Sequence, residues 1–365
     1  MSQQRIAGFD VARSLAIFGM IVVHFMLVMT DGMPAEKWSD TLLRLLDGRP
    51  AATFVILAGM GVTLMSNKRR DPSAAPDRRI IGTILRRRGL LLLAFGFLNL
   101  TIWQGDILRV YGVSLLIVPW LIWRNSHTLL ITGLAFVLAF CLLLTVFDYD
   151  RNWDWNTMTY HRLWTPVGLL RSLFYDGFRS VFPWTGLLIL GSWLGRLDWS
   201  TDNMPRRAMA WGLGMVIATS ALSRCLLTWL SVHPQPGLGH ESATALFGLQ
   251  SMPPLPIFLL NTIGCALLVI GASTLIERRW KDGWGVRALS ATGRMAFTWY
   301  VAHIVIGLGG VIVLGWTRAS HLQALGAASG FFAMAVATSL WWRSRFSNGP
   351  LEFILRSVGH DADRR

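Results

Sequence analysis

The sequence predicts an all-α, polytopic integral membrane protein with about ten transmembrane helices. Of its 365 residues, 53% are hydrophobic and only 15% are charged. Apolar runs of about 20 residues, enough to cross a hydrocarbon core of roughly 30 Å, recur along the whole chain. This composition excludes an ordinary soluble domain. The net charge of +14 then indicates membrane topology and contact with anionic lipid, with no nucleic-acid partner expected.

Ten spans are expected from the apolar runs, and the second of them is short enough to be tilted or partly re-entrant. If the N-terminus is cytoplasmic, 24 of the 34 Lys and Arg residues fall on the cytoplasmic side, as the positive-inside rule requires. An even number of spans also places the C-terminus in the cytoplasm. The expected spans are 11–30, 50–66, 80–100, 107–123, 128–147, 181–196, 208–230, 255–276, 293–316 and 323–342.

We expect one domain over residues 1–365, without a soluble part. The first apolar run has no small-residue cleavage site and continues as a full span, so no cleavable signal peptide is expected. No CxxC pair occurs among the three cysteines, so neither a disulfide framework nor a metal site is expected. An interfacial helix is predicted at 166–174 in the longest outer loop. The GxxxG from Gly191 to Gly195 is typical of a helix-packing face.

The first apolar helix carries ionisable side chains, which are costly inside a bilayer. Arg13 and His24 are eleven residues apart, close to three helical turns, so they share one face and lie roughly 16 Å apart along the axis. His24 is either a hydrogen-bonded structural residue or a general base, because a buried neutral imidazole can accept a proton. Gly19 between them would permit close approach of a partner or a ligand.

A cytoplasmic anion site is the second candidate feature. Asp10 and Arg13 are spaced to pair on the helix. They form either a simple interface ion pair or an anion site, since an arginine fork matches phosphate oxygens. Arg86, within a run of three arginines, and Arg294 are expected on the same side and are included in the candidate site.

Charged residues at the outer ends of the spans predict a paired network around a cavity. Asp47 and Asp106 are its candidate catalytic members, although charged groups at span ends often only reach the interface. His303 is a second imidazole within a span, for which a structural role is favoured. His240 lies in an outer loop and could serve an acceptor. The basic members expected in the network are Arg49, Arg109 and Arg224.

Several of these motifs resemble known membrane families. Arg13 and His24 match the Arg/Lys-x10-His pattern of the acyltransferase-3 proteins. The opening Arg5-Ile-x-Gly-x-Asp10-x-Ala-Arg13 with Gly19-Met20 and His24 more closely resembles bacterial proteins of the heparan-alpha-glucosaminide N-acetyltransferase type, in the same clan. The likeness continues from Asp47 to Gly59, from Gly105 to Tyr111 and from Gly293 to Tyr300. The end, Gly349-Pro-Leu-Glu352-Phe-Ile-Leu-Arg356, is similar to the DUF418 proteins, whose part is expected at about 200–360.

The resemblance implies a multi-pass acyltransferase of the bacterial cytoplasmic membrane. Acetyl-CoA or another acyl-CoA would be the donor, with its phosphates near Arg13, and an extracytoplasmic hydroxyl or amine of a glycan or glycolipid would be the acceptor. His24 is the first candidate base and His240 the second, because the first outer loop lacks the histidine of the lysosomal enzyme of this type. Direct transfer and an acetyl-histidine intermediate both stay open, and a homodimer is among the expected assemblies.

Two other classes of function remain as alternatives. A secondary transporter or exporter of a small anionic or lipid-linked solute is compatible with ten spans, although no inverted repeat is found. A non-catalytic scaffold or lipid-binding subunit would make the alignment of Arg13 with His24 a coincidence.

Overall fold

The computed structural model describes residues 6–68, 78–155 and 157–360, so Arg5 of the opening motif lies outside the described residues. The chain is predominantly helical, as predicted, with one two-stranded antiparallel hairpin. The helices of the first half are α1 (Ala7–Met29), α2 (Lys37–Leu46), α3 (Arg49–Lys68), α4 (Arg78–Asn99), α5 (Leu108–Ile117), α6 (Ser126–Val146) and α7 (Pro166–Phe174). The hairpin strands are β1 (Trp153–Asp154) and β2 (Thr159–Tyr160).

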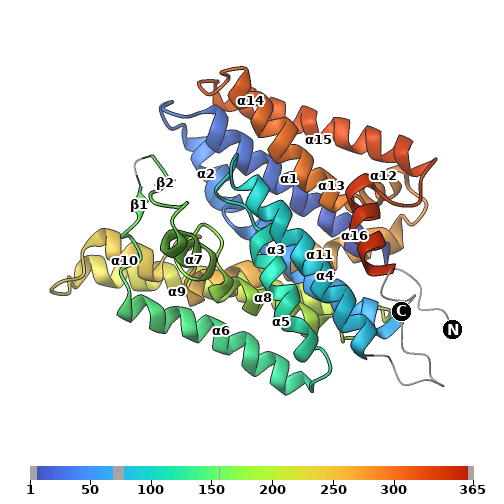
Figure 1. Cartoon of the computed structure of the whole chain (residues 1–365). Helices are drawn as coiled ribbons and strands as arrows, with labels where there is room; N and C mark the ends of the chain where they lie inside the picture. The colour runs from blue at the N-terminus through green and yellow to red at the C-terminus, as the bar shows by residue number, and fades with distance from the viewer. Residues whose placement is uncertain (1–5, 69–77, 156, 361–365) are drawn as a thin grey trace.

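The helices of the second half are α8 (Val181–Leu194), α9 (Asn203–Val232), α10 (His240–Phe247), α11 (Pro256–Arg279), α12 (Trp284–Gly293), α13 (Ala296–Ala302), α14 (Gly309–Val313), α15 (His321–Arg343) and α16 (Pro350–His360). A π-helical segment, His303–Leu308, joins α13 to α14. In Figure 1 the hairpin, α7 and α10 lie at one end of the bundle, and α12 and α16 lie at the other.

The protein is a multi-pass membrane protein. Seven helical stretches among the described residues are long and apolar enough to cross a membrane, and two shorter apolar helices, Leu108–Trp120 and Val181–Leu194, accompany them. The predicted span at 80–100 is the helix α4, but its five arginines distinguish it from the apolar spans. The second predicted span is the 20-residue helix α3. A total of ten crossings stays a prediction.

The core of the bundle lies around α1. Figure 1 places α1 beside α13 and α15, and its buried side chains pack against α3, α11 and α12 as well. Asp10 is among the buried residues of α1. Because it is surrounded by protein, the cost of an ionisable group in the span is lower. The charged face of the helix is therefore turned toward protein.

The GxxxG of α8 packs as predicted. A Cβ added at Gly191 would collide with the carbonyl oxygen of Ile56, and one at Gly195 would lie 2.9 Å from Cα of Met60. Both neighbours belong to α3. Small residues thus let the backbones of α3 and α8 meet closely. The helix predicted at 166–174 is present as α7, which begins at Pro166 after a Thr165 side chain that accepts from the Gly168 N–H. Its interfacial position stays a prediction.

Candidate functional site

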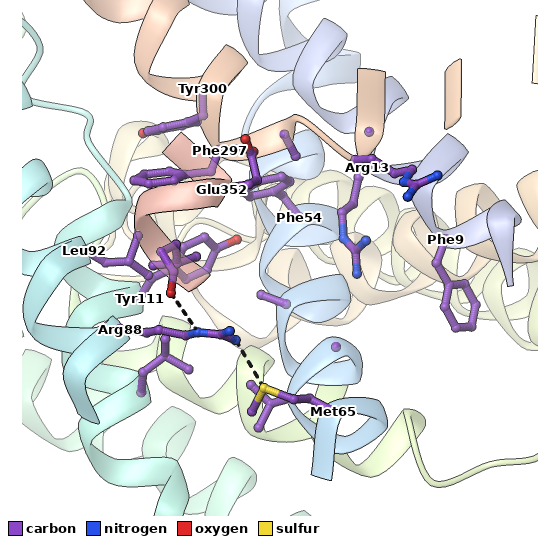
Figure 2. Close-up of a pocket in the computed structure, with 18 of the residues that line it drawn as sticks. Phe9, Arg13, Phe54, Met65, Arg88, Leu92, Tyr111, Phe297, Tyr300 and Glu352 are labelled. Carbon is purple, nitrogen blue, oxygen red and sulfur yellow. Dashed lines mark hydrogen bonds between the residues drawn. The ribbon is translucent and has the colours of Figure 1, made fainter. Parts of the chain in front are cut away.

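A cavity of about 590 Å³ lies between α1, α3, α4, α5, α13 and α16. Figure 2 shows its apolar walls, which include Phe54, Leu92 and Phe297. Its charged lining consists of four arginines and two carboxylates, so positive charge is in excess. These residues are Asp10, Arg13, Arg88, Arg294, Glu352 and Arg356.

The start of α1 supplies one corner of this cavity. Arg13 Nη1 donates to Asp10 Oδ1 at 2.6 Å, and the Asp10 side chain is only 2% exposed. Asp10 also sits in the first turn of the helix, where a carboxylate interacts favourably with the helix dipole. Arg13 Nη2 would lie 3.4 Å from a Cβ on Gly61 of α3, so the guanidinium reaches across the cavity toward α3. The predicted Asp10–Arg13 pair is formed, and it lines a cavity.

The other arginines arrive from three different helices. Arg88 of α4 donates from Nε to the Leu355 carbonyl at 3.2 Å and from Nη1 to Met65 Sδ at 3.1 Å, as Figure 2 shows. Arg294 follows α12 and lines the cavity as expected, and Arg356 joins from α16. Guanidinium groups gathered from four elements form a natural site for phosphate oxygens.

Arg86 lies elsewhere. Its side chain is exposed and does not belong to the cavity lining, whereas Arg88 does. Residues two positions apart on an α-helix point in directions that differ by about 200°. The side chains of Arg86 and Arg88 therefore leave α4 on nearly opposite faces.

Glu352 ties the C-terminal helix to the cavity wall. Its Oε1 accepts from the backbone N–H groups of Phe297 and Thr298 at 2.7 and 3.0 Å, and its Oε2 accepts from Thr298 Oγ1 at 2.6 Å. Burial raises the pKa of the Glu352 carboxyl, and these hydrogen bonds oppose that rise. The carboxylate therefore caps the first turn of α13, the helix that carries Tyr300.

His24 is paired with His303. Their Nδ1 and Nε2 atoms are 2.9 Å apart, and His303 Nδ1 lies 3.2 Å from the carbonyl oxygen of Trp299. The His303 side chain is fully buried. The Trp103 ring covers His24 at a centroid distance of 4.8 Å. The histidine favoured as structural from sequence is thus a direct partner of the first candidate base.

Tyr300 connects the cavity with this histidine pair. Its side chain lines the cavity, and its ring lies 5.2 Å from the ring of His303. The hydroxyl of Tyr111, on the same cavity wall, is buried without a hydrogen-bond partner in the described part of the chain. The arginine-lined cavity and His24 are therefore separated by two side chains, those of Tyr300 and His303.

Asp106 stands at the centre of a separate buried polar cluster. It accepts from Asn99 Nδ2 at 3.1 Å, from the Tyr300 hydroxyl at 3.2 Å and from the Arg109 backbone N–H at 3.2 Å. Burial raises the pKa of Asp106 to about 6, against the opposing effects of these partners. Arg109 is itself 1% exposed and donates to Ser172 Oγ at 3.3 Å. The hydrogen bond to Asp106 thus fixes the position of the Tyr300 hydroxyl.

The outer network predicted from sequence is divided into two groups. Asp47 accepts from the Ser251 N–H at 2.9 Å, and Arg49 donates twice to Asn261 Oδ1, at 3.0 and 3.2 Å. Within the described residues, no hydrogen bond joins this group to the Asp106 cluster. Arg224 is exposed on α9, so it belongs to neither group.

His240 is exposed at the first position of α10. Its backbone carbonyl accepts from Thr244 Oγ1 at 2.8 Å. No contact of its ring with His24 is found in the described ranges. The structure therefore brings together His24, Tyr300 and Asp106 but leaves Asp47 and His240 in other surroundings.

Sequence reasoning missed three residues around His24. Trp103 and Tyr300 were assigned no role there, although an aromatic beside a buried histidine is visible in the motif Thr298-Trp-Tyr-Val-Ala-His303. Arg179, between α7 and α8, stacks on the Trp184 ring at 4.7 Å and interacts electrostatically with His24 and Asp47. Its position in an outer loop gave no signal of this proximity. No group of three or more His, Cys, Asp or Glu side chains suited to a metal ion occurs among the described residues.

Comparison with known proteins agrees with the motifs. Residues 194–360 match a family described as a protein of unknown function, DUF418. A Bacillus subtilis (strain 168) protein described as uncharacterized protein YxaH is 29% identical over 177 residues, which cover 42% of this chain and 42% of that relative. The match thus spans less than half of the relative's length. Residues 5–234 match the family described as heparan-alpha-glucosaminide N-acetyltransferase, catalytic, and because that match covers more than half of the chain, the protein belongs to this family of membrane acetyltransferase type.

Proposed function

We propose that this protein transfers an acyl group, in the first instance acetyl, from cytoplasmic acyl-CoA to a hydroxyl or amine of a glycan or glycolipid at the outer face of the bacterial cytoplasmic membrane. The observation that carries this proposal is a chain of side-chain contacts that leads from the cavity to His24. An arginine-lined cavity reaches Tyr300, and the ring of Tyr300 contacts the His303 that is hydrogen-bonded to His24.

The lining of the cavity fits an acyl-CoA. The phosphates would bind Arg13, Arg294 and Arg356, because arginine forks match phosphate oxygens. The pantetheine arm carries amides and methylenes, which suit a wall of apolar side chains with one hydroxyl, that of Tyr111, buried without a partner among the described residues. The roughly 16 Å between Arg13 and His24, estimated from the helical rise, is comparable with an extended pantetheine.

The reaction needs one base and one departing thiolate. His24 removes the proton of the acceptor hydroxyl or amine as that atom attacks the thioester carbonyl carbon. The carbon–sulfur bond then breaks, and the CoA sulfur takes the proton from the His24 imidazolium. The products are the acylated acceptor and free CoA, with no net change in protons. A base placed in this way contributes on the order of 10²- to 10⁴-fold.

The proposed topology assigns each substrate a side. Ten crossings with cytoplasmic termini would place the arginine-lined end of the cavity in the cytoplasm, in accord with the positive-inside rule. The outer loops, which include β1, β2 and α7, would then face the acceptor. Direct transfer from the thioester is the simpler form of the proposal, and the same geometry would accommodate a short-lived acetyl-His24.

Donor binding is tested by thermal unfolding of the detergent-purified protein with acetyl-CoA, a longer acyl-CoA or CoA alone. A ligand that binds the folded state raises the apparent unfolding temperature by mass action. We expect acetyl-CoA and CoA to raise it, and Arg13→Ala to reduce the shift strongly.

The matched control is Arg224→Ala, since Arg224 is an exposed arginine of α9 outside the cavity lining. Its shift should equal that of the wild type. If none of the three compounds raises the unfolding temperature of the wild type, the acyl-CoA proposal fails. Equal losses in the Arg13 and Arg224 variants would contradict the placement of the phosphates.

A further inference from the structure

The histidine pair fixes where its protons lie. The carbonyl oxygen of Trp299 can only accept a hydrogen bond, so the hydrogen on His303 must be on Nδ1, which faces that oxygen at 3.2 Å. The Nε2 of an uncharged His303 then carries the lone pair. Because this atom lies 2.9 Å from His24 Nδ1, His24 must donate from Nδ1. In the uncharged pair, the free lone pair of His24 is therefore on Nε2.

The surroundings hold both rings in this arrangement. The His24 and His303 rings lie nearly parallel, with 24° between their planes and 5.2 Å between their centroids. Trp103 covers His24 at 4.8 Å, and Tyr300 meets His303 edge-on at 5.2 Å. No hydrogen bond to Nε2 of His24 is found within the described residues. The His24 ring is thus fixed by its Nδ1 hydrogen bond to His303, and its Nε2 can bind another partner.

The backbone at His303 departs from the regular helix. His303 begins the π-helical segment that interrupts the candidate span Ala296–Val313. Such segments are rare and occur often at functional sites. Here the change of helical pitch starts at the one residue that joins the Trp299 carbonyl to the ring of His24.

We propose that His303 is a positioning residue, which fixes the tautomer and the orientation of His24 so that Nε2 is the atom that accepts the acceptor's proton. This inference rests on the proposed function. When Nε2 takes a proton, His24 becomes an imidazolium whose Nδ1–H bond to His303 is charge-assisted and stronger than in the neutral pair. His303 therefore stabilises His24 as the reaction proceeds, without touching substrate.

The first test compares two substitutions of His303. The side-chain oxygen of His303→Gln reaches about as far as Nε2 and accepts a hydrogen bond, whereas His303→Leu fills the space without an acceptor. In native membrane vesicles supplied with radiolabelled acetyl-CoA, we expect His303→Leu to lower kcat about 100-fold or more, with KM for acetyl-CoA unchanged. His303→Gln should stay within about tenfold of the wild type.

Unfolding temperatures measured alongside identify a variant that fails to fold, and His303→Gln then decides the test. Wild-type kcat in a folded His303→Leu would overturn the proposal, as would a folded His303→Gln that is as inactive as His303→Leu. A loss confined to KM would also contradict it, because positioning of the base acts on the chemical step.

The second test does not depend on activity. In protein labelled with ¹⁵N histidine, the His24 signals are identified by their loss in His24→Ala. We expect nitrogen chemical shifts of a protonated Nδ1 and an unprotonated Nε2, and a change of this pattern in His303→Leu. A protonated Nε2 in the neutral wild type would overturn the tautomer assignment even if transfer is observed. Absence of transfer by a wild type with the expected tautomer would instead overturn the proposed function.

Discussion

Two buried groups of charged residues contrast within this bundle. Around Asp106, the carboxylate has hydrogen bonds from Asn99, Tyr300 and Arg109, and the side chains are at most 2% exposed. Around Arg13, four arginines and two carboxylates line an open volume of about 590 Å³. The first group is centred on one shared acceptor, Asp106, whereas the second surrounds a space with an excess of positive charge.

This difference separates a supporting role from a binding role. Buried charges with matched partners maintain structure, and the loss of one partner leaves the others unpaired. Positive charge in excess around a cavity favours an anionic ligand. Tyr300 belongs to both groups, because its hydroxyl bonds Asp106 and its side chain lines the cavity. Substitutions in the Asp106 group should therefore change stability, and those around Arg13 should change affinity.

The largest expected effect is that of Asp106→Ala. The substitution leaves the Asn99 amide, the Tyr300 hydroxyl and the Arg109 backbone N–H without their shared acceptor. It also removes the negative charge near the buried Arg109 guanidinium, and removal of one member of a buried charged group costs about 3–5 kcal/mol. Thermal or denaturant unfolding of the purified protein measures this loss. If the unfolding free energy changed by less than about 1 kcal/mol, Asp106 would not be the centre of a structural cluster.

Arg13→Ala should give the opposite pattern. Loss of a charge-assisted hydrogen bond of about 1.5–3 kcal/mol predicts that acetyl-CoA affinity falls about 10- to 100-fold. The unfolding temperature without ligand should fall less than in Asp106→Ala, because buried Asp10 loses its Arg13 partner beside an open cavity. Isothermal titration with acetyl-CoA measures the affinity, and Arg224→Ala serves as the exposed control. A variant that is destabilised but binds normally would remove the contrast between the two groups.

The stability contributed by Asp106 should depend on pH. Its folded-state pKa is raised by burial from 3.8 to about 6, so the folded state binds the proton more tightly than the unfolded state. This contribution is fully present below the unfolded pKa and is lost as the pH rises through about 6. Between about pH 4.5 and about pH 7.5, the wild type should lose about 2 kcal/mol relative to Asp106→Asn, which has no such titration. Parallel unfolding curves of the two proteins across this range would be inconsistent with a buried carboxyl of raised pKa.

The smallest expected effect is at Glu352, the cavity carboxylate that accepts hydrogen bonds from the start of α13. Glu352→Gln keeps an acceptor for the Phe297 and Thr298 N–H groups but removes the negative charge at the start of α13. A loss of about 1 kcal/mol is expected from the weaker cap, measured by urea unfolding. A loss as large as that of Asp106→Ala would place Glu352 among the structural charges and would narrow the binding group to the arginines.

The sequence predicted the helical fold and the face of α1 correctly because both follow from regular spacing. Apolar runs located the spans. The separation of eleven positions from Arg13 to His24 placed both on one side of a helix, and the structure shows Arg13 at the cavity and His24 in a histidine pair. The short helices α2, α10, α12 and α16 were not expected, because each is too short or too amphipathic to form an apolar run.

Contacts between distant segments could not be predicted in this way. The partner of His24 is 279 residues away in sequence, and nothing in local spacing joins the two. Arg86 and Arg88 belong to one run of three arginines, yet only Arg88 of these two lines the cavity, because which side chain faces the cavity depends on how α4 is rotated in the bundle. Asp47 and Asp106 were grouped only because both lie at outer ends of predicted spans. In the structure each has different hydrogen-bond partners.

The central claim, that His24 performs acyl transfer near the arginine-lined cavity, is tested most directly with His24→Ala in inside-out membrane vesicles of cells that produce the protein. Radiolabelled acetyl-CoA is supplied at the exposed cytoplasmic face, and label in the glycan and lipid fractions is measured. We expect incorporation to fall about 10²- to 10⁴-fold, while acetyl-CoA still raises the unfolding temperature of the purified variant. Incorporation at the wild-type rate by His24→Ala would contradict the account.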